Sequence, residues 1–217
     1  MDYEGLVTHV GNATYGAQAI VALWGAYCVV MVWRRVAQKR FRNEEAQIEF
    51  LTSVEEPLES GDYDAANAIC EGDLRAVPQL THLAIANRNL GFSKVRQIVV
   101  DRFQRDLMAD LEYRISWINM VIKSEPMLGL FGTVLGMMGA FAKLAGSETV
   151  KPTELAADIS LALITTAIGL AVAIPLGIAM AAINVRIKGM EDLAISGLTH
   201  VLESLRNGME SQGRRGG

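Results

Sequence analysis

Apolar residues fall into three long blocks along the chain, and most of the charged residues lie between those blocks. The blocks cover residues 10–33, 126–145 and 159–184. An α-helix needs about 20 apolar residues to cross the hydrocarbon core of a bilayer. Each block reaches that length; the second includes Lys143, whose long side chain can extend toward the lipid headgroups. The pattern therefore predicts an all-α integral membrane protein with three transmembrane helices.

Lysine and arginine cluster after the first and third blocks and are absent before the first. Cytoplasmic loops of membrane proteins carry an excess of these residues. The distribution predicts a periplasmic N-terminus (1–9), a cytoplasmic helical loop (34–125), a short periplasmic loop (146–158) and a cytoplasmic C-terminal helix and tail (185–217).

The loop 34–125 has the residue pattern of several helices. Good helix formers run over Glu44–Val54, and Pro57 is expected to end that helix. A turn with an aspartate cap then favours a short helix over 65–71, and another short helix is expected over 78–86.

A long helix is predicted to begin at Ser93, as its N-cap, and to run directly into the second block. The third helix is expected to continue past Arg186 through 193–205, with Gly189 as a weak point. Both extensions carry apolar residues at intervals of three and four, so we expect their apolar faces to pack against each other. The apolar positions of the first extension are Val95, Ile98, Val99, Phe103, Leu107, Leu111, Ile115, Ile118, Val121 and Ile122.

Composition narrows the possible functions. A net charge of −4 gives no basic surface for nucleic acid. The cysteines, Cys28 and Cys70, have no metal-site or disulfide spacing, and the three histidines are scattered over separate segments. No catalytic motif or phosphate-binding loop occurs. We therefore expect neither enzymatic activity nor a cofactor or metal.

Small residues recur every third or fourth position in the second and third blocks. Without a hydrophobic driving force between helices in lipid, such residues permit the close backbone approach that holds helices together. The pattern predicts tightly packed helices, and the positions are Gly129, Gly132, Gly136, Gly169, Ala173 and Gly177.

The uncharged polar side chains within these two blocks are few. Thr133 lies on the small-residue face of the second block, and Thr165 and Thr166 lie in the third. Each hydroxyl either bonds the carbonyl four residues back in its own helix or lines a path between helices. Without a charged group at mid-depth, an ion crossing here needs a carboxylate from another chain, or Asp158 near the start of the third block. Pro175 is expected to kink the third helix.

Two segments resemble the signatures of a known family. Leu128–Met137 is similar to the pattern LGLLGTVxGM, and Ile164–Pro175 is similar to ALITTAIGLxVAIP. Both are signatures of the MotA/TolQ/ExbB proton channel family, closest to its ExbB/TolQ-type subunits. The predicted topology is also that of these subunits.

This resemblance implies a homopentamer in the bacterial inner membrane, whose second and third helices line a central pore. A pair of single-span partner helices of the ExbD, TolR or MotB kind is implied within the pore, each bringing a membrane-embedded aspartate. The threonines implied on the ion path are Thr133 and Thr166. Relatives usually carry a glutamate five residues before the second threonine, and this chain has Leu161 there.

The resemblance thus implies the pore-forming subunit of an ion-driven motor, moving protons or sodium ions and coupling their flow to work at the cell envelope. An alternative is a non-conducting oligomeric scaffold that anchors the cytoplasmic helices in the membrane. The need for a partner with an intramembrane aspartate distinguishes the two hypotheses.

Overall fold

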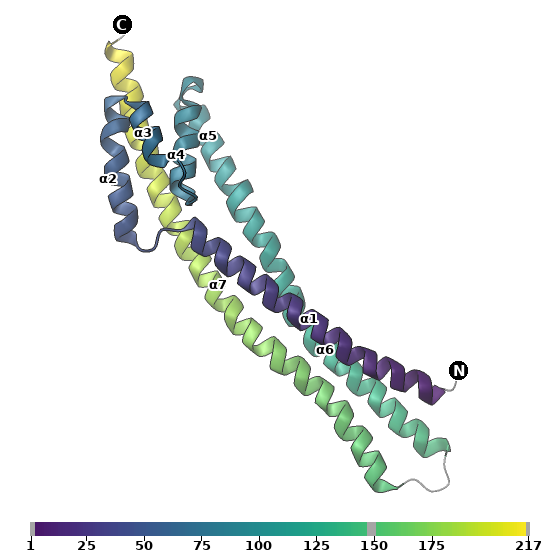
Figure 1. Ribbon diagram of the computed structural model, residues 1–217. Helices are drawn as coiled ribbons and strands as arrows, with labels where there is room; N and C mark the ends of the chain where they lie inside the picture. The colour runs from purple at the N-terminus through teal and green to yellow at the C-terminus, as the bar shows by residue number, and fades with distance from the viewer. Residues whose placement is uncertain (1–2, 147–150, 216–217) are drawn as a thin grey trace. The chain divides into compact units, whose positions relative to one another are not determined.

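The computed structural model describes residues 3–146 and 151–215, and the side chains of residues 13–145 and 151–212. All the regular elements within these ranges are helical (Figure 1). In chain order they are α1 (Tyr3–Lys39), α2 (Glu44–Ser60), α3 (Tyr63–Cys70), α4 (Ala76–Ala86), η1 (Arg88–Leu90), α5 (Phe92–Arg102), η2 (Phe103–Met108), α6 (Ala109–Gly146) and α7 (Pro152–Arg215).

Within the described residues, three helical stretches are long and apolar enough to cross a membrane. They are Ala13–Lys39, Phe92–Ala145 and Pro152–Gln212. The all-α class and the three predicted spanning helices are thereby confirmed. The exact membrane boundaries within these stretches stay predictions.

The chain forms two compact units. The first unit combines Met1–Met31 with Arg114–Ala182, and the second combines Val32–Tyr113 with Ile183–Gly217. Each of the three long helices contributes one part to each unit.

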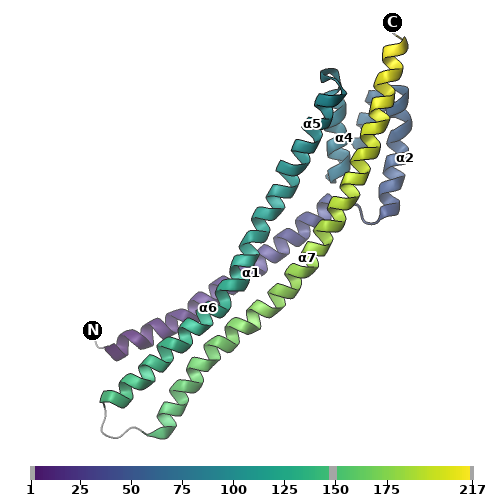
Figure 2. The ribbon, with the colours of Figure 1, turned by 180° about the vertical axis from the view of Figure 1, so that it is seen from behind.

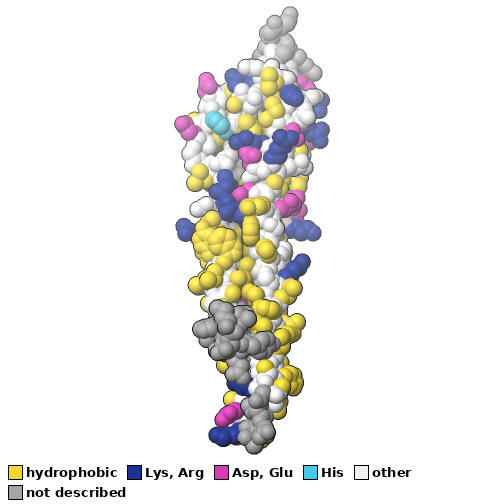
Figure 3. Space-filling view, turned by 90° about the vertical axis from the view of Figure 1, so that its right-hand side faces the viewer, with side chains coloured by type: hydrophobic (Ala, Val, Ile, Leu, Met, Phe, Trp, Pro, Cys, Tyr) yellow, Lys and Arg dark blue, Asp and Glu magenta, His cyan; other side chains and the backbone are white. Residues whose placement is uncertain are grey.

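In the first unit, α1, α6 and α7 lie side by side (Figures 1 and 2). Trp24 of α1 meets Trp117 of α6 edge to face, with ring centroids 6.2 Å apart. Many large apolar side chains of this unit are exposed, and hydrophobic side chains gather on it in the face that Figure 3 shows. Such exposure suits lipid or a neighbouring protein and is not expected of a water-soluble monomer.

The second unit has a hydrophobic core built from both helical extensions. Val95 and Val99 of α5, Leu107 of η2, and Leu198 and Leu205 of α7 all belong to this core. It also includes the apolar faces of α2, α3 and α4. The expected packing of the two extensions is present, as parts of one larger core.

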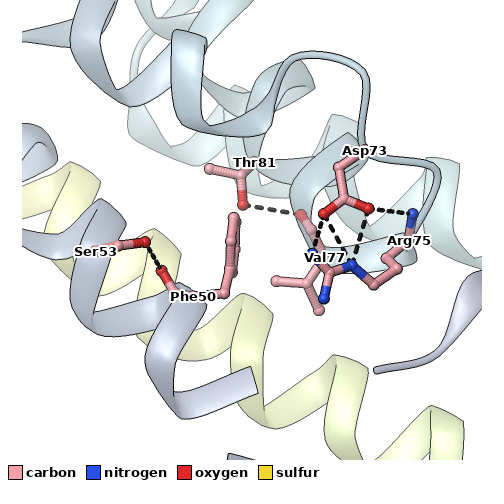
Figure 4. A network of polar contacts seen from close by, with 6 residues as sticks. All are labelled: Phe50, Ser53, Asp73, Arg75, Val77 and Thr81. Atoms are coloured by element: carbon pink, nitrogen blue, oxygen red, sulfur yellow. Dashed lines mark hydrogen bonds and ion pairs between the residues drawn. The ribbon is translucent and has the colours of Figure 1, made fainter. Parts of the chain in front are cut away.

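Polar contacts close the turns of the second unit. Asn43 accepts a hydrogen bond from the Ala46 amide at the start of α2, and Gly61 ends that helix in the left-handed conformation at φ 81°. Asp73 receives hydrogen bonds from Arg75 just before α4, as Figure 4 shows. The Arg75 hydrogen bonds hold the pKa of the Asp73 carboxyl below its usual range.

Three helix boundaries differ from the predictions. Pro57 does not end α2, which continues to Ser60 because Leu58 in the last turn is fully buried and Gly61 caps the end. Ser93 lies inside α5, whose N-cap is Gly91. The short helix expected over 65–71 instead begins at Tyr63, and its N-cap is Asp62.

The long helices also extend beyond the predicted blocks. α1 begins at Tyr3, within the expected N-terminal segment. α7 begins at Pro152, within the expected loop, and runs without a break through Gly189. The predicted weak point is therefore wrong, because a single glycine costs only about 1 kcal/mol in a helix interior that packing supports.

Candidate functional site

Glycines bring α6 and α7 into backbone contact in the first unit. A Cβ atom on Gly129 would lie 2.7 Å from the Thr165 carbonyl oxygen, and one on Gly136 would lie 2.5 Å from the Ala162 Cβ atom. At Gly132 the added atom would lie 2.7 Å from the Thr165 hydroxyl. A side chain at these positions has no room, so the two helices approach as closely as their backbones allow.

The close approach places two predicted residues of the ion path in contact. The hydroxyl oxygens of Thr133 on α6 and Thr166 on α7 are 2.5 Å apart. The Thr133 hydroxyl is also 3.1 Å from the Ala162 carbonyl oxygen and 3.2 Å from the Gly129 carbonyl oxygen. A hydroxyl has one proton to donate, so these acceptors compete for it. Thr133 can therefore donate its hydrogen bond either within its own helix or across to α7.

Thr165 is buried behind this pair. Its hydroxyl is 2.7 Å from the Ala162 carbonyl oxygen in its own helix and 2.9 Å from the Gly129 carbonyl oxygen on α6. The carbonyl of Gly129 is therefore shared by two threonine hydroxyls. The three threonines and this carbonyl form a compact polar cluster, which we call the threonine cluster.

Helix α1 also reaches the threonine cluster. The Gln18 side-chain amide donates to the Thr165 carbonyl oxygen at 3.0 Å. One turn away, the Tyr15 hydroxyl donates to the carbonyl oxygen of Leu161 at 3.1 Å. Since a helix carbonyl has a second lone pair, these bonds anchor α1 to α7 while α7 keeps its own ladder.

The other predicted positions lie away from the cluster. Asp158 pairs with Lys143 at 2.7 Å, about 10 Å along the helix axis from Thr165. Ala173 is buried, but Gly177 has no described atom near enough to contact an added Cβ atom. Pro175 lies inside α7, which continues on both sides of it.

Sequence reasoning missed three buried polar residues in this unit, Thr14, Gln18 and Glu125. Gln18 and Glu125 are almost completely buried, at 1% and 0% exposure. Gln18 is one of two side-chain amides in the first apolar block, and a polar residue in such a block is itself a signal of helix contact. Glu125 stands at the end of the segment expected to be cytoplasmic, where a carboxylate is ordinarily solvated.

Gly169 lies where Gln18 and Glu125 approach α7. A Cβ atom on Gly169 would lie 2.5 Å from the Glu125 carbonyl oxygen and 3.2 Å from the Gln18 amide nitrogen. The described residues contain no group of three or more metal-ligating side chains. The polar chemistry of this site thus consists of hydroxyls, amides, backbone carbonyls and one carboxyl group.

The chain is similar in sequence to known proteins. Residues 84–196 match the MotA/TolQ/ExbB proton channel family. The Tol-Pal system protein TolQ of Haemophilus influenzae is 41% identical over 81 residues, which are 37% of this chain and 36% of TolQ. The biopolymer transport protein ExbB of Pseudomonas putida is 30% identical over 147 residues, 64% of this chain and 42% of that protein. An ExbB of Helicobacter pylori is 36% identical over 91 residues, 42% of this chain and 62% of that protein.

These matches span less than two thirds of each of those relatives. The family match, however, covers more than half of this chain and includes Thr133, Thr165 and Thr166. With its three apolar helices, the chain is a multi-pass inner-membrane protein that belongs to the MotA/TolQ/ExbB proton channel family.

Proposed function

We propose that this chain is the pore-forming subunit of an inner-membrane motor that couples the flow of protons or sodium ions to mechanical work or transport across the cell envelope. The observation that carries the proposal is the contact between the Thr133 and Thr166 hydroxyls, 2.5 Å apart on two glycine-packed helices. Membership in a proton channel family supports the same role.

Hydroxyl groups suit a path for ions because each one both donates and accepts hydrogen bonds. In the pair, the Thr133 proton can point to Thr166 or to a backbone carbonyl, so its donor is easily redirected. A hydroxyl does not bind or release a proton at neutral pH by itself. The pathway therefore needs a carboxylate beside the threonines, and we assign it to a single-span partner of the ExbD, TolR or MotB kind.

The exposed apolar side chains of α6 and α7 support an assembly of several copies. On α6 they include Leu130, Phe131 and Val134, and on α7 they include Leu161 and Ile164. Side chains on the same helices that bear the threonines are thus available for neighbouring copies, a partner helix or lipid. We propose a homopentamer with α6 and α7 around the partner pair, a periplasmic N-terminus and a cytoplasmic C-terminus.

Replacing the pore threonines tests this function. Thr133→Val and Thr166→Val keep the side-chain shape and remove the hydroxyl. Proton and sodium uptake are measured in native membrane vesicles that also contain the single-span partner. We expect each variant to lower ion flux at least about ten-fold. Thr52→Val is the matched control, because the Thr52 hydroxyl is exposed and bonds only the Ile48 carbonyl in its own helix.

The non-conducting scaffold makes the opposite prediction. A scaffold shows no partner-dependent ion flux, and both valine variants then behave like the wild type. That result would exclude the ion path through Thr133 and Thr166.

A further inference from the structure

Glu125 carries a carboxyl group buried within the first unit. Its side chain has 0% exposure, and neither carboxyl oxygen has a hydrogen-bond partner among the described residues. It lies on the same face of α6 as Val121 and Gly129, one turn to either side, and both of these are buried. Burial of a carboxyl group without partners is destabilising, which makes Glu125 a candidate functional residue.

Gln18 offers the chemical complement of this group. Its amide nitrogen donates to the Thr165 carbonyl oxygen, which fixes which end of the amide is the oxygen. That oxygen is buried and has no partner among the described residues. An amide oxygen needs a donor, and a carboxyl group is a donor only when protonated. The Glu125 backbone carbonyl and the Gln18 amide nitrogen both border Gly169, so the two residues approach α7 at the same level.

Among the residues that the structure describes, no cationic side chain pairs with the Glu125 carboxyl group. Residues 10–33 of α1 and 159–183 of α7 contain no acidic, basic or histidine residue. On α6, Lys123 is exposed and only two residues away, so it points to another side of the helix. Arg114 lies three helical turns away. An isolated carboxylate is strongly disfavoured in apolar surroundings, so burial favours the protonated form of Glu125 in this conformation.

Glu125 also lies close to the threonine cluster along α6. Glu125 lies one turn from Gly129, whose carbonyl oxygen accepts from the Thr165 hydroxyl at 2.9 Å, and two turns from Thr133. Gln18 bonds the Thr165 carbonyl oxygen. Glu125, Gln18 and the threonine cluster therefore lie on neighbouring turns of α6, α1 and α7.

We propose that Glu125 is a proton-binding residue of the ion pathway and that Gln18 is its hydrogen-bond partner in the protonated state. This inference rests on the proposed function and specifies its ion as the proton. In each cycle the Glu125 O–H bond breaks, and the proton passes to a water molecule on one side. The carboxylate then regains a proton from hydronium on the side of the threonine cluster, so one proton enters for each that leaves.

A carbodiimide tests whether Glu125 is protonated. Dicyclohexylcarbodiimide partitions into apolar regions and adds to protonated carboxyl groups, which leaves a stable N-acylurea. The full chain is treated in native membranes at about pH 7, where solvated carboxyls are ionised, and the modified peptides are found by mass spectrometry. We expect modification at Glu125 and none at the exposed Glu112 on the same helix. Equal labelling of the two residues, or none at Glu125, would overturn the proposal.

Proton flux tests whether that proton moves. Glu125→Gln keeps the shape and the hydrogen-bonding capacity but cannot titrate, so we expect flux to fall at least about ten-fold. Glu112→Gln is the control. If Glu125→Gln conducts like the wild type while Thr166→Val does not, the role of Glu125 is wrong and the proposed function stands. If neither variant changes the flux, both are wrong. If Glu125→Gln does not assemble, the labelling of the wild-type chain decides.

Discussion

At the scale of single residues, the absence of side chains at a few glycines decides how the first unit packs. An added Cβ atom on Gly129 would meet backbone atoms of Thr165 and Thr166, at 2.7 and 2.8 Å. Backbone atoms inside a helix cannot rotate out of the way as a flexible side chain can. The contact between the Thr133 and Thr166 hydroxyls therefore depends on the lack of a side chain at Gly129, one turn from Thr133.

Gly129→Ala is expected to destabilise the folded chain by about 1–3 kcal/mol, because the new methyl group forces α6 away from α7. Thermal unfolding in mild detergent, followed by helical circular dichroism, measures the effect as a lower melting temperature. Gly189→Ala on α7 is the matched control, since a Cβ atom there meets nothing within 4 Å. It is expected to stabilise the helix by up to about 1 kcal/mol. Equal melting temperatures for the two variants would contradict the packing argument.

Asp73 gives the second unit a pH dependence of known sign. The Arg75 hydrogen bonds lower the pKa of its carboxyl in the folded chain. The folded pKa is thus below the unfolded value of about 4, so the stabilisation is present above that value and is lost as pH falls through the folded pKa. We expect Asp73→Asn to lower the unfolding free energy by no more than about 1 kcal/mol at neutral pH.

This difference between the wild type and Asp73→Asn should vanish in acid, near and below the folded pKa. Urea unfolding at a series of pH values measures it. A difference that is unchanged between neutral and acidic pH would show that the ion pair is not its source.

At the scale of elements, the helical segment that leads into the second spanning block is interrupted by one wide turn. Phe103–Met108 forms a π-helix between α5 and α6, with Phe103 and Leu107 buried in the core of the second unit. A π-helical turn contains one more residue than an α-helical turn. The extra residue lets the apolar face of α5 and the apolar face of α6 each meet its own partners.

Deleting Gln104, an exposed residue of the π-helix, is therefore expected to convert the turn to regular α-helix and to keep both flanking faces in register. Deleting Gln97, an exposed residue of regular α5, rotates one side of the helix by about 100° against the other. We expect the Gln104 deletion to melt at a clearly higher temperature than the Gln97 deletion. If both deletions lower the melting temperature equally, the π-helix does not store a spare residue.

At the scale of the whole molecule, the distribution of lysine and arginine predicts how the chain is oriented in the membrane. A membrane-impermeant maleimide tests the orientation on single-cysteine variants that lack Cys28 and Cys70. Lys151→Cys and Asp64→Cys both place the thiol at an exposed position. We expect labelling of Lys151→Cys in intact spheroplasts and of Asp64→Cys only after lysis. The reverse pattern would place the N-terminus in the cytoplasm.

The sequence by itself determined the elements that depend on local composition. Crossing a bilayer requires about 20 consecutive apolar residues, and such a run is visible along the chain whatever it packs against. The three spanning helices, the small-residue faces and the apolar face of α5 were predicted for this reason. Pro57 and Ser93 were misjudged because propensity is weak beside the burial of Leu58 and the backbone conformation at Gly91.

Only the tertiary structure decided which polar groups meet. Gln18, Glu125 and Thr165 are separated by up to 147 residues along the chain, and the rotation and spacing of α1, α6 and α7 bring them together. No periodicity in the sequence records the rotation of one helix against another. Glu125 follows a polar segment and carries a charge-bearing side chain, so its local pattern indicates a solvated residue. Gly169 allows Glu125 to be buried, because a side chain at position 169 would hold α6 and α1 away from α7.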